Sequence, residues 1–208
     1  MHSNPKPEYQ ITAHSGVIAA SLSADAVLFH FRNPPTNVGG DTNERLVKLR
    51  QLIVKWRTIT GYTSAQELAL AAYDVSVFGA TPADYTGGTS LGTSAKVIGP
   101  HSLQNHPTHA SLLSAGNCSI ATTAGLSHAG TPTVATHPFA WDSYGELAAA
   151  STVAKGAFDL VWTASLEGID DGKGRCYQPG TGFVIRNPIA LGAGGTGRLF
   201  VDVIWSEA

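Results

Sequence analysis

Histidines gather in one stretch of the sequence, GPHSLQNHPTHASL, which contains His101, His106 and His109. Neutral imidazole nitrogens bind transition metals, so a metal site is the first chemistry to consider. However, the spacing matches no metal-ligand motif, no carboxylate lies among the three residues, and Pro107 interrupts any helix that would align them. We therefore expect these histidines to serve as hydrogen-bonding or interface residues that protonate as the pH falls.

Two further motifs resemble ligand sites without completing them. The segment IDDGKGRC, residues 169–176, begins like a calcium loop but lacks the alternating acidic ligands and the closing glutamate, so a hairpin turn at Asp171-Gly172 is the better interpretation. The segment GAGGTG, residues 192–197, lacks the lysine of a phosphate-binding loop and precedes a predicted strand. Because no catalytic arrangement can be argued from spacing either, we expect no enzymatic activity, cofactor or metal.

The two most similar stretches of the chain are FHFRNPP, residues 29–35, and FVIRNPI, residues 183–189. In each, two apolar residues spaced by two predict a strand, and Asn-Pro predicts its end. The echo is either a coincidence of strand endings or the trace of a duplicated sheet. The apolar positions are expected to be buried, and the arginines to fix turns or a subunit contact through their planar donor fork. The predicted turn-fixing or subunit-contact residues are Arg32, Asn33, Arg186 and Asn187.

The composition excludes several classes of protein. The 208 residues are 13% charged, against about 25% in a typical domain, and carry a net charge of -2. This balance argues against nucleic-acid binding and against an acidic disordered chain. No apolar run approaches the ~18 residues of a membrane span, so we expect a soluble protein with no membrane partner. Cys118 and Cys176 are predicted to be unpaired thiols.

Apolar residues recur mostly with a period of two, which indicates strands. At the C-terminus Leu199, Val201, Val203 and Trp205 alternate with more polar residues, and residues 27–32 and 158–163 alternate in the same way and predict half-buried strands. Residues 66–78 and 117–127 are also expected to form strands. With about seven strands and turn-rich connections, the predicted fold is all-β: an antiparallel two-sheet sandwich of jelly-roll type with long loops.

Residues 44–60 fit two structures. Leu46, Leu49, Ile53 and Trp56 would form the apolar stripe of a helix. The same segment also alternates strictly, with one slip of phase near Gln51, which is the pattern of a strand interrupted by a β-bulge. Its β-branched and aromatic residues favour the long bent strand, although the helix stays open.

The expected organisation is an extended N-terminal arm, residues 1–12, followed by one β-sandwich domain, residues 13–208. Pro5 and Pro7 favour the extended arm, which would lie on a neighbouring subunit or on another protein of the same assembly. Within the domain, residues 79–151 hold only 4 of the 28 charged residues. Such a neutral excursion is ordered either against an outside partner or against its own sheet.

The order of FRNPPTN, WRTITGYTSAQE and GFVIRNPIALGAGGTGRLFVDVIWSEA, with a Gly/Thr/Ala-rich middle, resembles structural proteins of tailed bacteriophages. It resembles capsid decoration, or cement, proteins in particular. The resemblance implies a β-sandwich homotrimer that binds the major capsid protein and is found in the virion after assembly in the host cytoplasm. It carries over no functional residues, and tail or fibre components share this composition.

A carbohydrate-binding jelly-roll module is the alternative from another class. Such a module needs an exposed aromatic platform, for which Tyr62, Tyr85, Trp141 and Tyr144 are the candidates. Aromatic residues in such loops are more often packing anchors.

Overall fold

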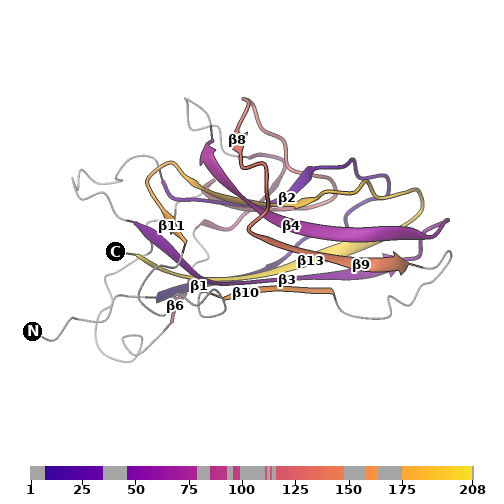
Figure 1. Cartoon of the computed structure of the whole chain (residues 1–208), viewed down its shortest axis with the longest axis horizontal. Helices are drawn as coiled ribbons and strands as arrows, with labels where there is room; N and C mark the ends of the chain where they lie inside the picture. The colour runs from indigo at the N-terminus through magenta and orange to yellow at the C-terminus, as the bar shows by residue number, and fades with distance from the viewer. Residues whose placement is uncertain are drawn as a thin grey trace, which may run out of the picture.

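The computed structural model shows an all-β protein with two antiparallel sheets (Figure 1). It describes residues 8–34, 46–78, 85–92, 96–98, 111, 113, 116–147, 158–163 and 175–207. Within these ranges there are thirteen strands and no α-helix, and therefore no helix that is long and apolar enough to cross a membrane. The predicted all-β, two-sheet architecture is thus confirmed.

The first sheet, called sheet A, has the order β10-β3-β13-β1-β6, and β11 also pairs with β3. Its strands are β10 (Phe158–Thr163), β3 (Val47–Thr60), β13 (Thr196–Glu207), β1 (Glu8–His14), β6 (Lys96–Ile98) and β11 (Cys176–Tyr177). The second sheet, called sheet B, has the order β5-β7-β2-β12-β4-β8, and β9 also pairs with β4. Its strands are β5 (Gly88–Ser90), β7 (Cys118–Ala121), β2 (Ala26–Arg32), β12 (Gly182–Asn187), β4 (Gln66–Val77), β8 (Thr133–Val134) and β9 (Ala140–Leu147).

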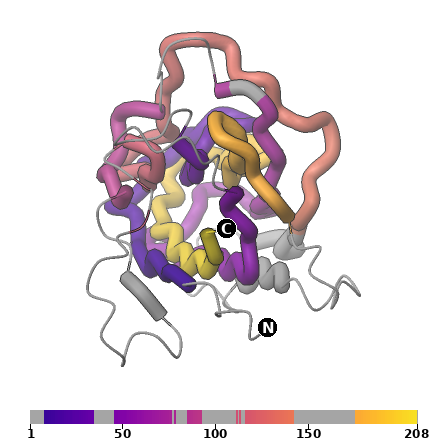
Figure 2. Tube along the Cα trace, turned by 90° about the vertical axis from the view of Figure 1, so that its left-hand side faces the viewer, coloured from indigo at the N-terminus to yellow at the C-terminus, as the bar shows by residue number. Residues whose placement is uncertain are grey.

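The long strands alternate between the two layers along the chain. Strands β1, β3 and β13 belong to sheet A, whereas β2, β4 and β12 belong to sheet B. Figure 2 shows the strands nearly end-on, arranged around a central core. The chain passes from one sheet to the other between β1 and β2, between β2 and β3, between β3 and β4 and between β12 and β13, so residues distant in the sequence meet between the sheets.

Aromatic side chains dominate the contact between the sheets. Phe31 from β2 stacks on Phe183 from β12, with ring centroids 5.3 Å apart, and meets Trp205 from β13 edge-on at 5.2 Å. Trp205 also stacks on Tyr9 from β1 at 5.7 Å. Such pairs add about 0.5–1.5 kcal/mol each to the free energy of burial alone. The expected burial of Phe29, Phe31, Phe183 and Ile185 is confirmed, because all four are 0% exposed.

Strand β3 confirms the extended interpretation of residues 47–60. Its register against β13 shifts between Ile204 and Trp205, which leaves Arg50 as the extra residue between Leu49 and Gln51. The predicted bulge near Gln51 is therefore present. It restores the alternation, so that the residues buried on either side of it are Leu49 before the bulge and Leu52, Val54, Trp56 and Thr58 after it.

The N-terminal region differs from the expected arm. Residues 8–14 form β1, which lies inside sheet A between β13 and β6. Tyr9 and Ile11 are each 1% exposed and belong to the core. From residue 8 onward the chain is therefore part of the protein's own sheet A and not a separate arm, while residues 1–7 are outside the described residues.

The charge-poor excursion, in its described parts, is built into the protein's own sheets. Strand β6 joins sheet A, and β5, β7, β8 and β9 join sheet B. Thr, Gly and Ala suit this role because they allow backbones to pair closely: a Cβ added to Gly88 would lie 2.4 Å from the Ile120 carbonyl oxygen. Of the two interpretations of this segment, packing against the protein's own sheets therefore describes these parts.

Strand β2 was expected to be half-buried, but it is buried on both faces. Phe29 and Phe31 face the core between the sheets, and Leu28 and His30 on the opposite face are also 0% exposed. Rings of Phe78 and Tyr85 lie against His30 on that outer face. The prediction failed because alternation within a strand does not reveal a distant segment that covers its second face.

Candidate functional site

The two echoed sequences lie side by side at the centre of sheet B. Strand β2 pairs antiparallel with β12, with Phe31 opposite Phe183 and Phe29 opposite Ile185. The first apolar residue of each copy therefore faces the second apolar residue of the other, which gives the pair a local two-fold relationship. The echo thus marks two neighbouring strands of one sheet.

Each asparagine of the echo holds the turn that precedes the other copy. Asn33 Nδ2 donates to the Tyr177 carbonyl at 2.9 Å, and Asn187 Nδ2 donates to the Ser23 carbonyl at 2.9 Å. Tyr177 precedes Phe183 by six positions, and Ser23 likewise precedes Phe29. Both asparagines are buried, so each of these hydrogen bonds is shielded from water. The two bonds link the strand ends reciprocally.

The two turns also share a backbone shape. The Ala26 N–H donates to the Ser23 carbonyl at 3.4 Å, and the Thr181 N–H donates to the Gln178 carbonyl at 3.0 Å. The third residue of each turn has a positive φ, 59° at Asp25 and 83° at Gly180. A residue with positive φ at this place is typical of type II turns, where glycine is favoured and Asp or Asn is tolerated. The sequence similarity therefore extends into structure before each copy begins.

The two arginines of the echo lie at opposite ends of the β2–β12 pair. Arg32 is opposite Gly182, and Arg186 is opposite Val27. The Arg32 guanidinium lies over the Phe78 ring at 5.4 Å, and that of Arg186 lies over the Tyr73 ring at 5.7 Å. The arginines do not converge on one site, and their role in a subunit contact stays a prediction. His101, His106 and His109 fall outside the described residues.

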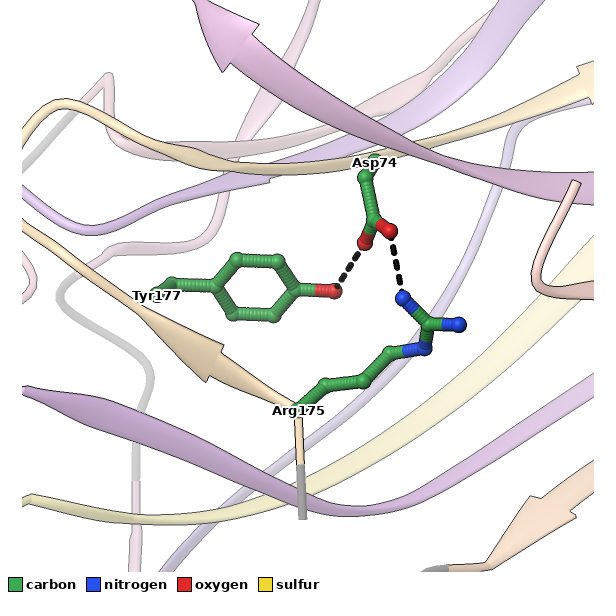
Figure 3. A network of polar contacts seen from close by, with 3 residues as sticks. All are labelled: Asp74, Arg175 and Tyr177. Atoms are coloured by element: carbon green, nitrogen blue, oxygen red, sulfur yellow. Dashed lines mark hydrogen bonds and ion pairs between the residues drawn. The ribbon is translucent and has the colours of Figure 1, made fainter. Parts of the chain in front are cut away.

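A polar network connects the two sheets beside the turn at residues 178–181 (Figure 3). Asp74 comes from β4 in sheet B, whereas Arg175 and Tyr177 lie at and next to β11 in sheet A. Arg175 Nη1 donates to Asp74 Oδ2, and the Tyr177 hydroxyl donates to Asp74 Oδ1 at 3.0 Å. The Arg175 guanidinium also lies over the Phe139 ring at 4.2 Å. One carboxylate therefore joins the edge of sheet A to sheet B.

An ion pair and a hydrogen bond to Asp74 hold the two sheets together in this network. Burial raises the pKa of Tyr177 well above its usual value, and the Asp74 carboxylate raises it further, so the phenol stays protonated and keeps donating. A depression of about 320 Å³ lies beside it, and the exposed Cys176 is part of its lining. The other cysteine, Cys118, is unpaired and buried, and burial raises the pKa of its thiol, which makes it unreactive.

A second depression, of about 500 Å³, adjoins the turn at residues 23–26, and Tyr85, His128 and Arg186 are among its lining residues. Below it, the ring of Tyr85 contacts both His30 and His128, with centroids 5.2 Å and 4.7 Å away. Burial lowers the pKa of His30 to about 4, so its imidazole is neutral. Neither His128 nor any other described residue belongs to a group of three potential metal ligands.

The candidate aromatic platform is largely absent from the surface. Tyr62 and Tyr85 are 1% and 4% exposed, and burial raises the pKa of Tyr62 to about 12. Trp141 on β9 is 57% exposed, while the Tyr144 side chain lies outside the described residues. Two of the four candidates are therefore packing anchors.

Comparisons with protein-family models, with curated proteins and with solved structures give no match for this chain. The assignment of function consequently depends on the site geometry and on the sequence pattern. Sequence reasoning identified Arg186, considered Tyr85 only as part of an aromatic platform, and missed Asp25 and His128 around the same depression. These residues come from separate parts of the chain, and no local sequence signal joins them.

Proposed function

We propose that this protein is a virion structural protein, a capsid decoration protein that binds the major capsid lattice as a homotrimer. The sequence resemblance to phage structural proteins supports the proposal, and so does the antiparallel two-sheet architecture, for which we propose jelly-roll topology. The observation that carries the proposal is the outer face of sheet A.

The outer face of sheet A combines apolar side chains with charged ones. Across the strands, Phe200 pairs in register with His14 on one side and Lys55 on the other, and Asp202 pairs with Ile53. Phe200 is 36% exposed, and Ile53 and Ile204 are half-buried. The solvated face of an antiparallel sheet is normally polar. Apolar residues at the centre of this face are therefore suited to contact with another protein.

The same face carries an excess of positive charge, although the whole chain has a net charge of -2. Strand β3 contains four cationic residues and no acidic one, and β13 adds Arg198 directly opposite Arg57. On the neighbouring positions Asp202 accepts hydrogen bonds from Gln10 and Thr12. A partner surface with an apolar centre and surrounding carboxylates would complement this face, and we assign that chemistry to the capsid lattice.

Burial of Tyr62 and Tyr85 weighs against the carbohydrate-binding module as the main function, because a stacking platform requires exposed rings. A tail or fibre role would use the same sheet face against a different virion protein. The assay described next separates these roles.

The test is co-sedimentation of the purified protein with empty shells assembled from the major capsid protein of the same virus. We expect saturable binding that weakens with salt, and loss of binding in the double variant Phe200→Ser, Arg57→Glu. The matched control is Trp141→Ser on sheet B, which removes a more exposed aromatic residue from the other sheet and should bind normally. Absence of binding by the wild type, or equal binding by both variants, would refute the proposal.

A further inference from the structure

The depression beside the turn at residues 23–26 has the size of a small-ligand site. Its volume of about 500 Å³ falls within the range of roughly 300–1,000 Å³ typical of such sites. One wall is the segment from Ala19 to Val27, the other comes from Thr123 to Leu126 and His128, and Tyr85 and Arg186 complete the lining. These residues come from four separate parts of the chain, so the fold has to be complete for the cavity to exist.

The wall of this cavity holds unusual backbone conformations. Ser21 has a φ of 61° and Asp25 a φ of 59°, and these are the two non-glycine residues with positive φ in the described part of the chain. Each such conformation costs about 1 kcal/mol or more and persists only where the surrounding structure enforces it. Both line the cavity. Their coincidence at one place favours a functional role for the wall.

Three side chains around the cavity carry a buried polar atom without a hydrogen-bond partner among the described residues. These atoms are Tyr85 Oη, His128 Nε2 and Arg186 Nε. Burial raises the pKa of Tyr85, and the nearby Arg186 guanidinium opposes that rise. Each unsatisfied buried group costs about 1–3 kcal/mol. A bound ligand oxygen would offset part of this cost.

The unpartnered atoms include donors and acceptors. Arg186 Nε always carries a proton, and the Tyr85 hydroxyl both donates and accepts. His128 Nδ1 lies 3.0 Å from both the nitrogen and the carbonyl oxygen of Gly130, so Nε2 donates in one tautomer of the ring and accepts in the other. A ligand whose oxygen atoms both donate and accept would suit this side of the cavity.

The charges around the cavity cancel without pairing with each other. Asp25 and Arg186 both line it and both influence the Tyr73 phenol, but they form no ion pair with one another. A ligand between them must donate to a carboxylate and accept from a guanidinium. Hydroxyl groups do both, and the remaining polar lining includes the hydroxyls of Ser21, Ser23 and Thr123. A net charge of zero also disfavours a strongly anionic ligand.

We propose that this cavity binds a neutral saccharide of one or two rings, with Asp25 accepting from and Arg186 donating to its hydroxyl groups. The site is separate from the outer face of sheet A and would operate whether or not the protein attaches to a capsid. It is a polar cavity, in contrast to the stacking platform considered from the sequence.

The test follows amide chemical shifts by NMR while the isolated protein is titrated with glucose, galactose, N-acetylglucosamine, maltose and lactose at millimolar concentration. We expect at least one sugar to shift amides of residues 19–27 and 123–128 in a saturable way. Asp25→Asn, which tolerates the same backbone conformation, and Arg186→Gln should each weaken binding about tenfold. Thr89→Ala on β5, which is exposed and not part of the lining, should bind like the wild type.

An amide spectrum that matches the wild type outside the cavity will show that each variant is folded. The proposal is overturned if no sugar shifts these amides, if both variants bind sugar as tightly as the wild type, or if only a free amino acid such as glutamate or an inorganic anion binds there. Because this titration uses no capsid shells, its failure leaves the sheet A proposal standing, and the reverse also holds.

Discussion

His30 should make the stability of the protein depend on pH between 7.5 and 5. Its side chain is 0% exposed, and burial lowers its pKa from 6.5 to about 4. The Gly116 carbonyl, 2.9 Å from Nε2, works in the opposite direction, while the nearby Arg32 and His128 lower the pKa further. The His30 imidazole therefore binds a proton less readily in the folded protein than in the unfolded chain.

The sign and size of the pH effect on the free energy of unfolding follow from the difference between the two pKa values of His30. Above pH 6.5 both states hold a neutral imidazole, and the stabilising effect is fully present. As the pH falls below 6.5 the unfolded state gains a proton first, so the free energy of unfolding decreases by about 2 kcal/mol at pH 5 and by about 3 kcal/mol near pH 4. The conversion uses about 1.4 kcal/mol for each pKa unit.

The assay is urea unfolding of the wild type and of His30→Gln at pH 7.5, 6 and 5. Glutamine can still donate to the Gly116 carbonyl but does not titrate. The wild type should lose about 2 kcal/mol more than His30→Gln between pH 7.5 and 5. His14→Gln is the control, because His14 is exposed on β1 and should follow the wild type. Equal pH dependence of wild type and His30→Gln would refute the reasoning.

Four further substitutions test the connections around the β2–β12 pair. Asn33→Ala should lower the free energy of unfolding by about 1–3 kcal/mol, because the buried Tyr177 carbonyl loses its Asn33 donor. Asn187→Ala should cost about 1 kcal/mol, because the Ser23 carbonyl loses the Asn187 donor but keeps the Ala26 N–H. Equal stability of the variants and the wild type in urea unfolding would show that these asparagines do not stabilise the turns. Tyr177→Phe should lower the free energy of unfolding by about 1 kcal/mol, because the hydrogen bond to Asp74 is lost. A melting temperature equal to that of the wild type would show that this hydrogen bond does not stabilise the contact between the sheets. Gly182→Ala should cost about 2–3 kcal/mol, because the new Cβ would lie 2.0 Å from the Phe31 carbonyl oxygen; unchanged thermal unfolding would mean that β2 and β12 separate more easily than the pairing indicates.

Strong local patterns predicted the elements of the fold well. The alternation of Leu199, Val201, Val203 and Trp205 predicted β13 and its core face, and the slip of phase near Gln51 predicted the bulge in β3. Both succeed because side-chain alternation is a property of the strand itself. The N-terminal strand β1 was missed because the prolines before it were given more weight than Tyr9 and Ile11, which face the core.

The candidate site was predicted only in part, because its contacts join distant segments. Asn33 and Asn187 were expected to bond their own turns, whereas Asn33 bonds Tyr177 and Asn187 bonds Ser23 as well as its neighbour Ile189. Which strands become neighbours is decided by the packing of both sheets, and no local pattern records it. For the same reason the cavity residue Tyr85 was considered only as part of a platform.

The most direct test of the central claim is a cryo-electron microscopy reconstruction of empty shells incubated with the purified protein. The account predicts additional three-fold symmetric density on the outer surface of the lattice, into which the β-sandwich fits with Phe200 and Arg57 of sheet A facing the capsid protein. Bare shells, or density in which sheet B contacts the lattice while sheet A faces solvent, would contradict it.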